Sequence, residues 1–184
     1  MTITVRRSVA SDRRAILALM QASRGEDLSP EERSKQGFVQ GSMDDATLAR
    51  LQEAPGVFVA EEAGSLAGFA MTSAPGMFAS GPPRETVDAV AAAVPAGTRL
   101  FLYGPVAVDP RFQGRGVMTA LLTGLSRDLA ECYDLGAAFI EVANAKSLAV
   151  HRHYGMGEVA RFTVGAREYV VFAFDPAAFA TRTG

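Results

Sequence analysis

A glycine-rich turn between an apolar segment and an amphipathic segment constrains the fold of this chain more than any other feature. Residues 99–108 form an apolar run that predicts a buried strand. Residues 117–129 carry mostly apolar side chains at spacings of three and four, which predicts a helix. Gly114 and Gly116 lie in the turn between them. Glycine permits sharp bends and close approach, and the first amides of a helix lack internal partners. The sequence therefore predicts an anion-binding turn, with a phosphate as the expected ligand.

The turn does not fit the two commonest nucleotide-binding motifs. A dinucleotide-binding turn would have a third glycine at the position of Thr119, and no lysine follows in the place that a nucleoside-triphosphate loop requires. A tight connection that binds no ligand, and a nucleotide-binding α/β protein of another kind, stay open as alternatives.

The rest of the chain predicts alternating strands and helices in one α/β domain. Gly104 and Pro105 interrupt the strand before the turn, which predicts a bulge or a local parting of strands, because proline cannot donate to a sheet ladder. The order of the elements predicts a mixed sheet. The expected strands cover residues 2–6, 57–61, 66–71, 99–108, 137–142, 158–164 and 167–174, and the expected helices include residues 13–24, 85–94 and 144–154, with helix starts at Ser29 and Asp44.

Composition narrows the class of protein. The 184 residues, 48% of them hydrophobic, predict a single domain over residues 1–184 with a sizeable core. A net charge of −2 argues against a general nucleic-acid binder. The lone Cys132 excludes an internal disulfide, and His151 and His153 alone are too few ligands for a metal site. The sequence shows no signal peptide and no stretch of membrane-spanning length, so we expect a cytoplasmic protein without membrane contact.

The segment around the turn resembles a known family. Residues 106–116 read Val-Ala-Val-Asp-Pro-Arg-Phe-Gln-Gly-Arg-Gly. This run is similar to the acetyl-CoA site of the GCN5-related N-acetyltransferases (GNAT), whose pattern of a glutamine or arginine followed by two spaced glycines is met by Arg111, Gly114 and Gly116. Asn144 and His151 follow at the spacing of a second family motif. The resemblance implies a single GNAT-like α/β domain. Its sheet is expected to be mixed and mostly antiparallel, with about seven strands, flanking helices and a central parallel pair that splays apart.

The resemblance also implies how acetyl-CoA would be bound. The strand end would hydrogen-bond the pantetheine arm, the turn and helix start would hold the pyrophosphate, and the next helix would lie on the pantetheine side. Arg115 and Asn144 have alternative interpretations, as a solvated arginine and as a helix cap. The residues implied for the cofactor are Val106, Ala107, Val108, Arg111, Gln113, Gly114, Arg115, Gly116, Val117, Met118, Asn144 and Ser147.

Acetyl transfer to an amine needs a proton for the departing thiolate. Family members often carry a tyrosine near the sulfur, but this chain has His151 at that position and Tyr154 three residues later. We expect His151 to serve as the acid, with Tyr154 as the substitute. Glu61 and Glu141 are interpreted as surface or capping charges, and the sequence identifies no general base.

The resemblance predicts an acetyl-CoA-dependent N-acetyltransferase that acts on a primary amine of a small molecule or a protein. A non-catalytic acyl-CoA-binding or regulatory domain is the alternative. The family places the acceptor pocket in residues 26–50, 73–83 and 161–169, where Asp44 and Asp45 would select a cation. The hydrophobic hairpin of residues 162–174 could pack against a second subunit in a homodimer, although packing in the core of the same chain is the default interpretation. The residues predicted to contact the acceptor are Phe38, Met43 and Tyr103.

Overall fold

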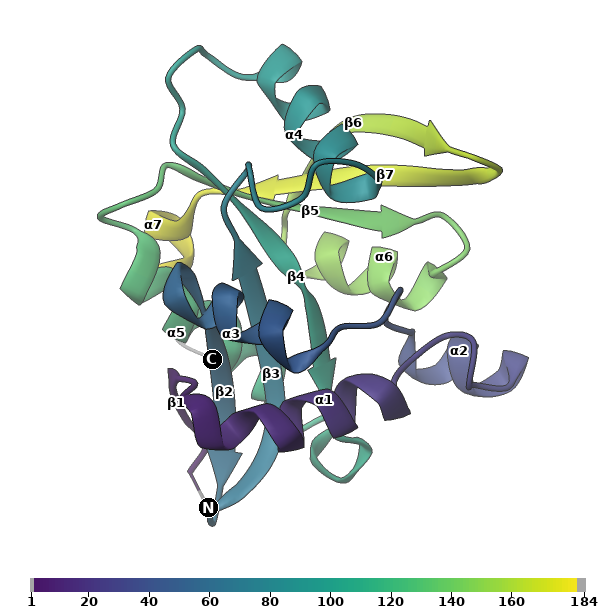
Figure 1. The fold of residues 1–184 in the computed structure, drawn as a ribbon, viewed down its shortest axis with the longest axis vertical. Coiled ribbons are helices and arrows are strands. Elements are labelled where there is room, and N and C mark those ends of the chain that lie inside the picture. The colour runs from purple at the N-terminus through teal and green to yellow at the C-terminus, as the bar shows by residue number, and fades with distance from the viewer. Residues whose placement is uncertain (1, 182–184) are drawn as a thin grey trace.

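The computed structural model describes residues 2–181. Within this part of the chain, short strands and helices alternate (Figure 1). In chain order the elements are β1 (Thr4–Arg7), the 3-10 helix η1 (Ala10–Asp12), α1 (Arg13–Ala22), α2 (Pro30–Gln36), α3 (Asp45–Glu53), β2 (Pro55–Glu62), β3 (Ser65–Ser73), α4 (Pro82–Ala93), β4 (Leu100–Val108), the 3-10 helix η2 (Pro110–Phe112), α5 (Val117–Leu129), β5 (Leu135–Glu141), α6 (Ala145–His153), β6 (Gly157–Val164), β7 (Arg167–Phe174) and α7 (Pro176–Ala180).

The described residues form one seven-stranded sheet in the order β1-β2-β3-β4-β5-β7-β6. Neighbouring strands run antiparallel except β4 and β5, which run parallel. These two central strands pair from Leu100 with Leu135 to Leu102 with Ala137, and no pairing between them is found beyond that point in the described chain. In Figure 1 β5 runs to the right, whereas β4 runs downward past α6 and ends close to α1. The predicted mixed, mostly antiparallel sheet with a splayed parallel pair is confirmed.

A bulge accompanies the divergence of β4. Its pairing with β3 shifts between Ala70, opposite Val106, and Thr72, opposite Tyr103. Three steps along β4 therefore match two steps along β3, so β4 contains one extra residue. Gly104, with φ of 115°, occupies this stretch in a backbone region that side-chain-bearing residues rarely adopt. The interruption predicted from Gly104 and Pro105 is thus confirmed as a bulge.

Helices cover both faces of the sheet. Helices α5, α6 and α7 pack on one face, where their apolar side chains join Phe101, Tyr103 and Phe172 in the largest core cluster. On the other face α1 and α3 cover β2 and β3, and α4 covers β5, β7 and β6 (Figure 1). Helix α5 approaches β1 very closely, because a Cβ placed on Gly124 would lie only 2.5 Å from Val5 Cγ1.

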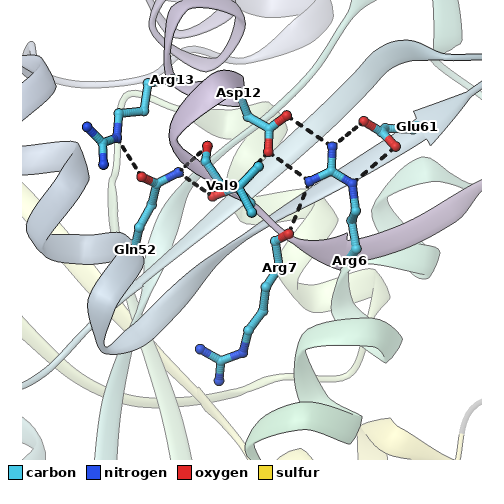
Figure 2. A network of polar contacts seen from close by, with 8 residues as sticks. Arg6, Arg7, Val9, Asp12, Arg13, Gln52 and Glu61 are labelled. Atoms are coloured by element: carbon cyan, nitrogen blue, oxygen red, sulfur yellow. Dashed lines mark hydrogen bonds and ion pairs between the residues drawn. The ribbon is translucent and has the colours of Figure 1, made fainter.

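A polar network fixes α1 and the start of the chain to the sheet (Figure 2). The Arg6 guanidinium donates to both oxygens of Asp12, at 2.7 and 3.0 Å, and to Glu61 on β2. The Arg6 side chain lowers the pKa of the Asp12 carboxyl. Gln52 of α3 donates to the Ser8 hydroxyl and the Val9 carbonyl, both at 2.9 Å. Arg13, the first residue of α1, donates to the Gln52 side chain at 2.6 Å, so the network holds the start of α1 against α3.

Some elements differ from those predicted. The first strand covers Thr4–Arg7 rather than residues 2–6, and α1 ends at Ala22 rather than at residue 24. The 3-10 helices and α7 were not predicted. In residues 2–181, no helix has the length and apolar character needed to cross a membrane, and no group of three metal-ligating side chains is found.

Candidate functional site

The parting of β4 and β5 coincides with a cleft of about 670 Å³. Its walls come from the end of β4, the glycine turn, α6, the C-terminal end of α1 and residues 35–39. The structure therefore brings together segments that are far apart in the sequence. The residues predicted for cofactor binding that line this cleft are Val106, Ala107, Val108, Gln113, Gly114, Gly116, Val117, Met118, Asn144 and Ser147.

The glycine turn exposes the start of α5 to the cleft. Gly114 and Gly116 have φ of 73° and 78°, so both use the left-handed region that glycine tolerates best. Gly116 is the N-cap of α5 and, within the described chain, no side chain caps this end. The first backbone bond here runs from Ala120 N to the Gly116 carbonyl at 2.9 Å, which leaves the preceding helical amides available to a ligand. With the helix dipole, this end of α5 favours an anion.

The two arginines of the turn bond to carboxylates of the protein. Arg111 pairs with Asp109 at 2.8 Å, and Arg115 pairs with Glu62 at 2.6 Å. Glu62 is only 5% exposed, whereas Arg115 is 42% exposed. Both guanidinium groups lie over the Phe112 ring, at 5.5 and 5.4 Å from its centroid. Neither arginine is among the described residues that line the cleft, so they support the turn in this structure, and their direct contact with a cofactor stays a prediction.

The end of β4 presents an unpaired edge to the cleft. Val106 and Val108 pair with β3 on one side, opposite Ala70 and Gly68. On the other side, in the described chain, β5 pairs with β4 only as far as Leu102. Unpaired strand amides and carbonyls can bond an extended ligand as they would another strand.

Asn144 joins α6 to the segment that crosses the cleft. Its Oδ1 accepts from Ser147 N at 3.2 Å, which makes it the N-cap of α6, and its Nδ2 donates to the Phe38 carbonyl at 2.9 Å. Asn144 is 6% exposed. The helix-cap interpretation is confirmed, and the same side chain also fixes Phe38 in the cleft wall.

His151 is buried on α6 at the edge of the cleft, with 2% exposure. Its Nδ1 lies 2.7 Å from the Ser147 carbonyl, so Nδ1 carries a hydrogen and donates. Its Nε2 is buried and has no hydrogen-bond partner among the described residues. Burial lowers the pKa of His151, only partly offset by the Ser147 carbonyl. The neutral ring therefore has no proton on Nε2 to give.

Tyr154 offers a hydroxyl in the same cleft. The residue is half-buried at the C-cap of α6, and its hydroxyl lies 2.9 Å from Thr119 Oγ1 in the first turn of α5. This bond joins the glycine-turn helix to the helix that carries His151. Of the two predicted acids, Tyr154 has the transferable proton in the neutral state.

The three residues predicted to contact the acceptor are placed differently. Phe38 lines the cleft. Tyr103 is buried in the core, with its hydroxyl 3.7 Å from Met118 Sδ, and burial raises its pKa. Met43 packs against the core cluster beneath α1 and α3. Neither Tyr103 nor Met43 is among the described residues that line a cavity, so their contact with a substrate stays a prediction.

A second cavity of about 340 Å³ adjoins the cleft and shares Phe38 and Val39 with it. Charged side chains from the α1–α2 loop, α2, the end of β5 and the start of β7 line it; these are Arg24, Glu26, Arg33, Glu141 and Arg167. No motif in the sequence indicates this cluster. Asp44 caps α3 and Asp45 pairs with Arg13, and neither is among the described residues that line the two cavities, so cation selection by these carboxylates stays a prediction.

Comparisons with solved structures show the same fold in known proteins. The protein smu.2055 from Streptococcus mutans UA159 has a TM-score of 0.66 at 15% identity, covering 96% of this chain and 99% of that chain. The protein yncA from Salmonella typhimurium, whose structure includes its cofactor acetyl-CoA, has a TM-score of 0.64 at 19% identity. The match covers 96% of this chain and 95% of that chain. The ribosomal-protein-S18-alanine N-acetyltransferase from Escherichia coli has a TM-score of 0.63 at 18% identity. The match covers 95% of this chain and 94% of that chain. A search of curated protein sequences finds no significant match.

The family is shown by sequence. The sequence model of the acetyltransferase (GNAT) family matches residues 18–156, which is more than half of the chain. The match contains β4, the glycine turn, α5 and α6, the elements that build the cleft. This chain therefore belongs to the GNAT family of acetyltransferases, which take the acetyl group from acetyl-CoA.

Proposed function

We propose that this protein transfers the acetyl group of acetyl-CoA to a primary amine of a small molecule or a protein. The observation that best supports this is the content of one cleft. It combines an anion-binding helix start, an unpaired strand edge and a tyrosine hydroxyl. The donor needs partners for its pyrophosphate and for its amide-bearing arm, and the thiolate it leaves needs a proton.

The chain's own groups fit this donor. The amides at the start of α5, from Val117 onward, would bind the pyrophosphate, and no side-chain cap within the described residues competes for them. The free edge of residues 106–108 would bond the amides of the pantetheine arm. The Ser147 side chain lies on the opposite wall. Arg111 and Arg115 would act by holding the turn in shape.

The reaction requires two proton movements. The amine nitrogen bonds to the thioester carbonyl carbon, the carbon–sulfur bond breaks, the amine loses one proton and the sulfur gains one. Tyr154 is proposed as the donor to sulfur, since it lines the cleft and its phenolic O–H can donate a proton. His151, neutral with an unprotonated Nε2, is proposed as a buried hydrogen-bond acceptor rather than as the acid.

Incubation of the purified protein with acetyl-CoA and a panel of amines tests the proposal. We expect free CoA to appear with an acetylated amine of matching mass, at a rate that depends on the amine. Tight CoA binding without product from any amine would instead support a non-catalytic acyl-CoA-binding domain. Thermal stabilisation by a dinucleotide in preference to CoA would contradict both.

A further inference from the structure

We propose that the second cavity binds the carboxylate of a small amino-acid-like acceptor, so that the amine substrate is one that also carries a carboxylate. This inference rests on the proposed function, because it treats the cleft as the acetyl-CoA site. The cavity shares Phe38 and Val39 with that cleft, so a molecule in it lies directly beside the proposed donor site. Its volume of about 340 Å³ is in the range of small-molecule sites.

Two guanidinium groups on different elements provide the anion site. Arg33 comes from α2 and Arg167 from the start of β7. Arg33 Nε donates to the Leu28 carbonyl at 3.3 Å, and its guanidinium carbon lies 5.8 Å from the Phe38 ring centroid. Within the described chain neither arginine has a carboxylate partner, in contrast to Arg111 and Arg115. A planar guanidinium matches a carboxylate with two parallel hydrogen bonds.

The other charges of the cavity complete a site for a zwitterion. Arg24 and Glu26 form an ion pair at 2.6 Å, so their charges neutralise each other. The half-buried Glu141 accepts from the Gln40 amide and has no cationic partner among the described residues. The cavity therefore offers two unpaired cations and one unpaired carboxylate. A ligand with one carboxylate and one ammonium group can pair with charges of both signs in the cavity, whereas a simple amine can pair only with Glu141.

Glu141 lies close to Arg167 at the edge of the sheet. It is the last residue of β5, the strand whose divergence from β4 accompanies the cleft. Glu141 pairs with Tyr169, two residues along β7 from Arg167, so an ammonium group at Glu141 would lie next to a carboxylate at Arg167.

Matched acceptors test the inference directly. Amino acids are compared with their carboxamides, which keep the amine and the side chain but lack the negative charge. For the wild-type protein we expect kcat/KM to favour the carboxylate by about 100-fold, the scale of losing one doubly bonded charged contact. Arg33→Gln and Arg167→Gln should each reduce this preference at least about 10-fold while leaving the affinity for CoA unchanged. The control Arg84→Gln, on α4 and paired with Asp88, should keep the full preference.

The outcomes separate this inference from the proposed function. Equal rates for carboxylates and carboxamides, or loss of rate on both in the arginine variants, would overturn the carboxylate site while the acetyltransferase assignment stands. Faster acetylation of aminophosphonates than of amino acids, or acetylation of peptides alone, would also overturn it. Calorimetric titration of amino acids into the CoA-loaded protein gives a readout without turnover; binding that Arg33→Gln abolishes supports the site even where no product forms.

Discussion

The ion pair between Arg115 and Glu62 gives the sharpest test of how the glycine turn works. Two roles are open to Arg115: it contacts the cofactor directly, or it holds the turn through Glu62. The structure favours the second role, because the guanidinium lies 2.6 Å from a carboxylate that is almost fully buried. Arg115→Gln and Glu62→Gln therefore distinguish the roles, since each variant removes one charge of the pair.

The expected cost to stability follows from the burial of the two partners. Removing one partner of a fully buried pair costs about 3–5 kcal/mol, because the other charge is left without compensation. Here the Arg115 side chain is 42% exposed, so water screens the pair and the cost falls to about 1–2 kcal/mol. For a chain of this length, that corresponds to a decrease in Tm of about 2–8 °C in thermal unfolding.

Calorimetric titration of CoA into each variant then measures the role. If Arg115 holds the turn, both single variants weaken CoA binding by about 10-fold, which is about 1.4 kcal/mol, and the double variant is no weaker than either. Glu62→Gln would bind CoA as tightly as the wild type, or more tightly, if Arg115 contacted the phosphates directly. That result would refute the supporting role.

Three further predictions concern the proton donor, the buried histidine and the core. Tyr154→Phe should lower kcat about 100-fold in steady-state assays and leave CoA affinity unchanged, and Thr119→Val should lower kcat less; an unchanged kcat in Tyr154→Phe would exclude it as the acid. Because burial lowers the pKa of His151 below 6.5, the unfolded chain binds the proton more readily, so stability should fall as pH drops below 6.5. His151→Leu should show less of this fall in Tm between pH 7.5 and pH 5; an identical fall would contradict the assignment. Gly124→Ala should lose about 1–3 kcal/mol in denaturant unfolding, since its Cβ would meet Val5, and Val5→Ala should restore part of the loss; an additive double variant would contradict the clash.

The glycine turn and the interruption of β4 were predicted correctly because glycine and proline restrict or extend the backbone conformations available at their own positions. Gly114 and Gly116 adopt positive φ values, and Gly104 and Pro105 lie at a bulge. Both follow from the conformational limits of glycine and proline, which act locally and can be read from neighbouring residues. Helix α7 was missed because its five residues are too few to show a period, although Asp175 does cap it.

Side-chain roles were predicted less well, because they depend on distant partners. Arg115 belongs to the motif, yet its guanidinium pairs with Glu62, which is distant in the sequence and lies on β2. Asp44 and Asp45 suggested an anionic pocket, but a carboxylate at a helix start is satisfied locally: Asp44 Oδ1 accepts from Thr47 N at 2.7 Å. His151 fits the spacing of a catalytic tyrosine, but the neighbouring carbonyl of Ser147 fixes which nitrogen carries its proton.

The two cavities differ in what specifies them, and this explains why one could be predicted and the other could not. The features of the cleft that are proposed to bind the donor are backbone features, namely the strand edge, the positive-φ turn and the helix start, and all lie within residues 103–119. The second cavity is built from side chains of Arg33, Glu141 and Arg167, which the sheet order and α2 bring together. A substitution in any of these changes the charge of the cavity without changing the fold. The proposed donor site can therefore stay constant while the proposed acceptor site varies, and the acceptor must be inferred from the structure rather than from the motif.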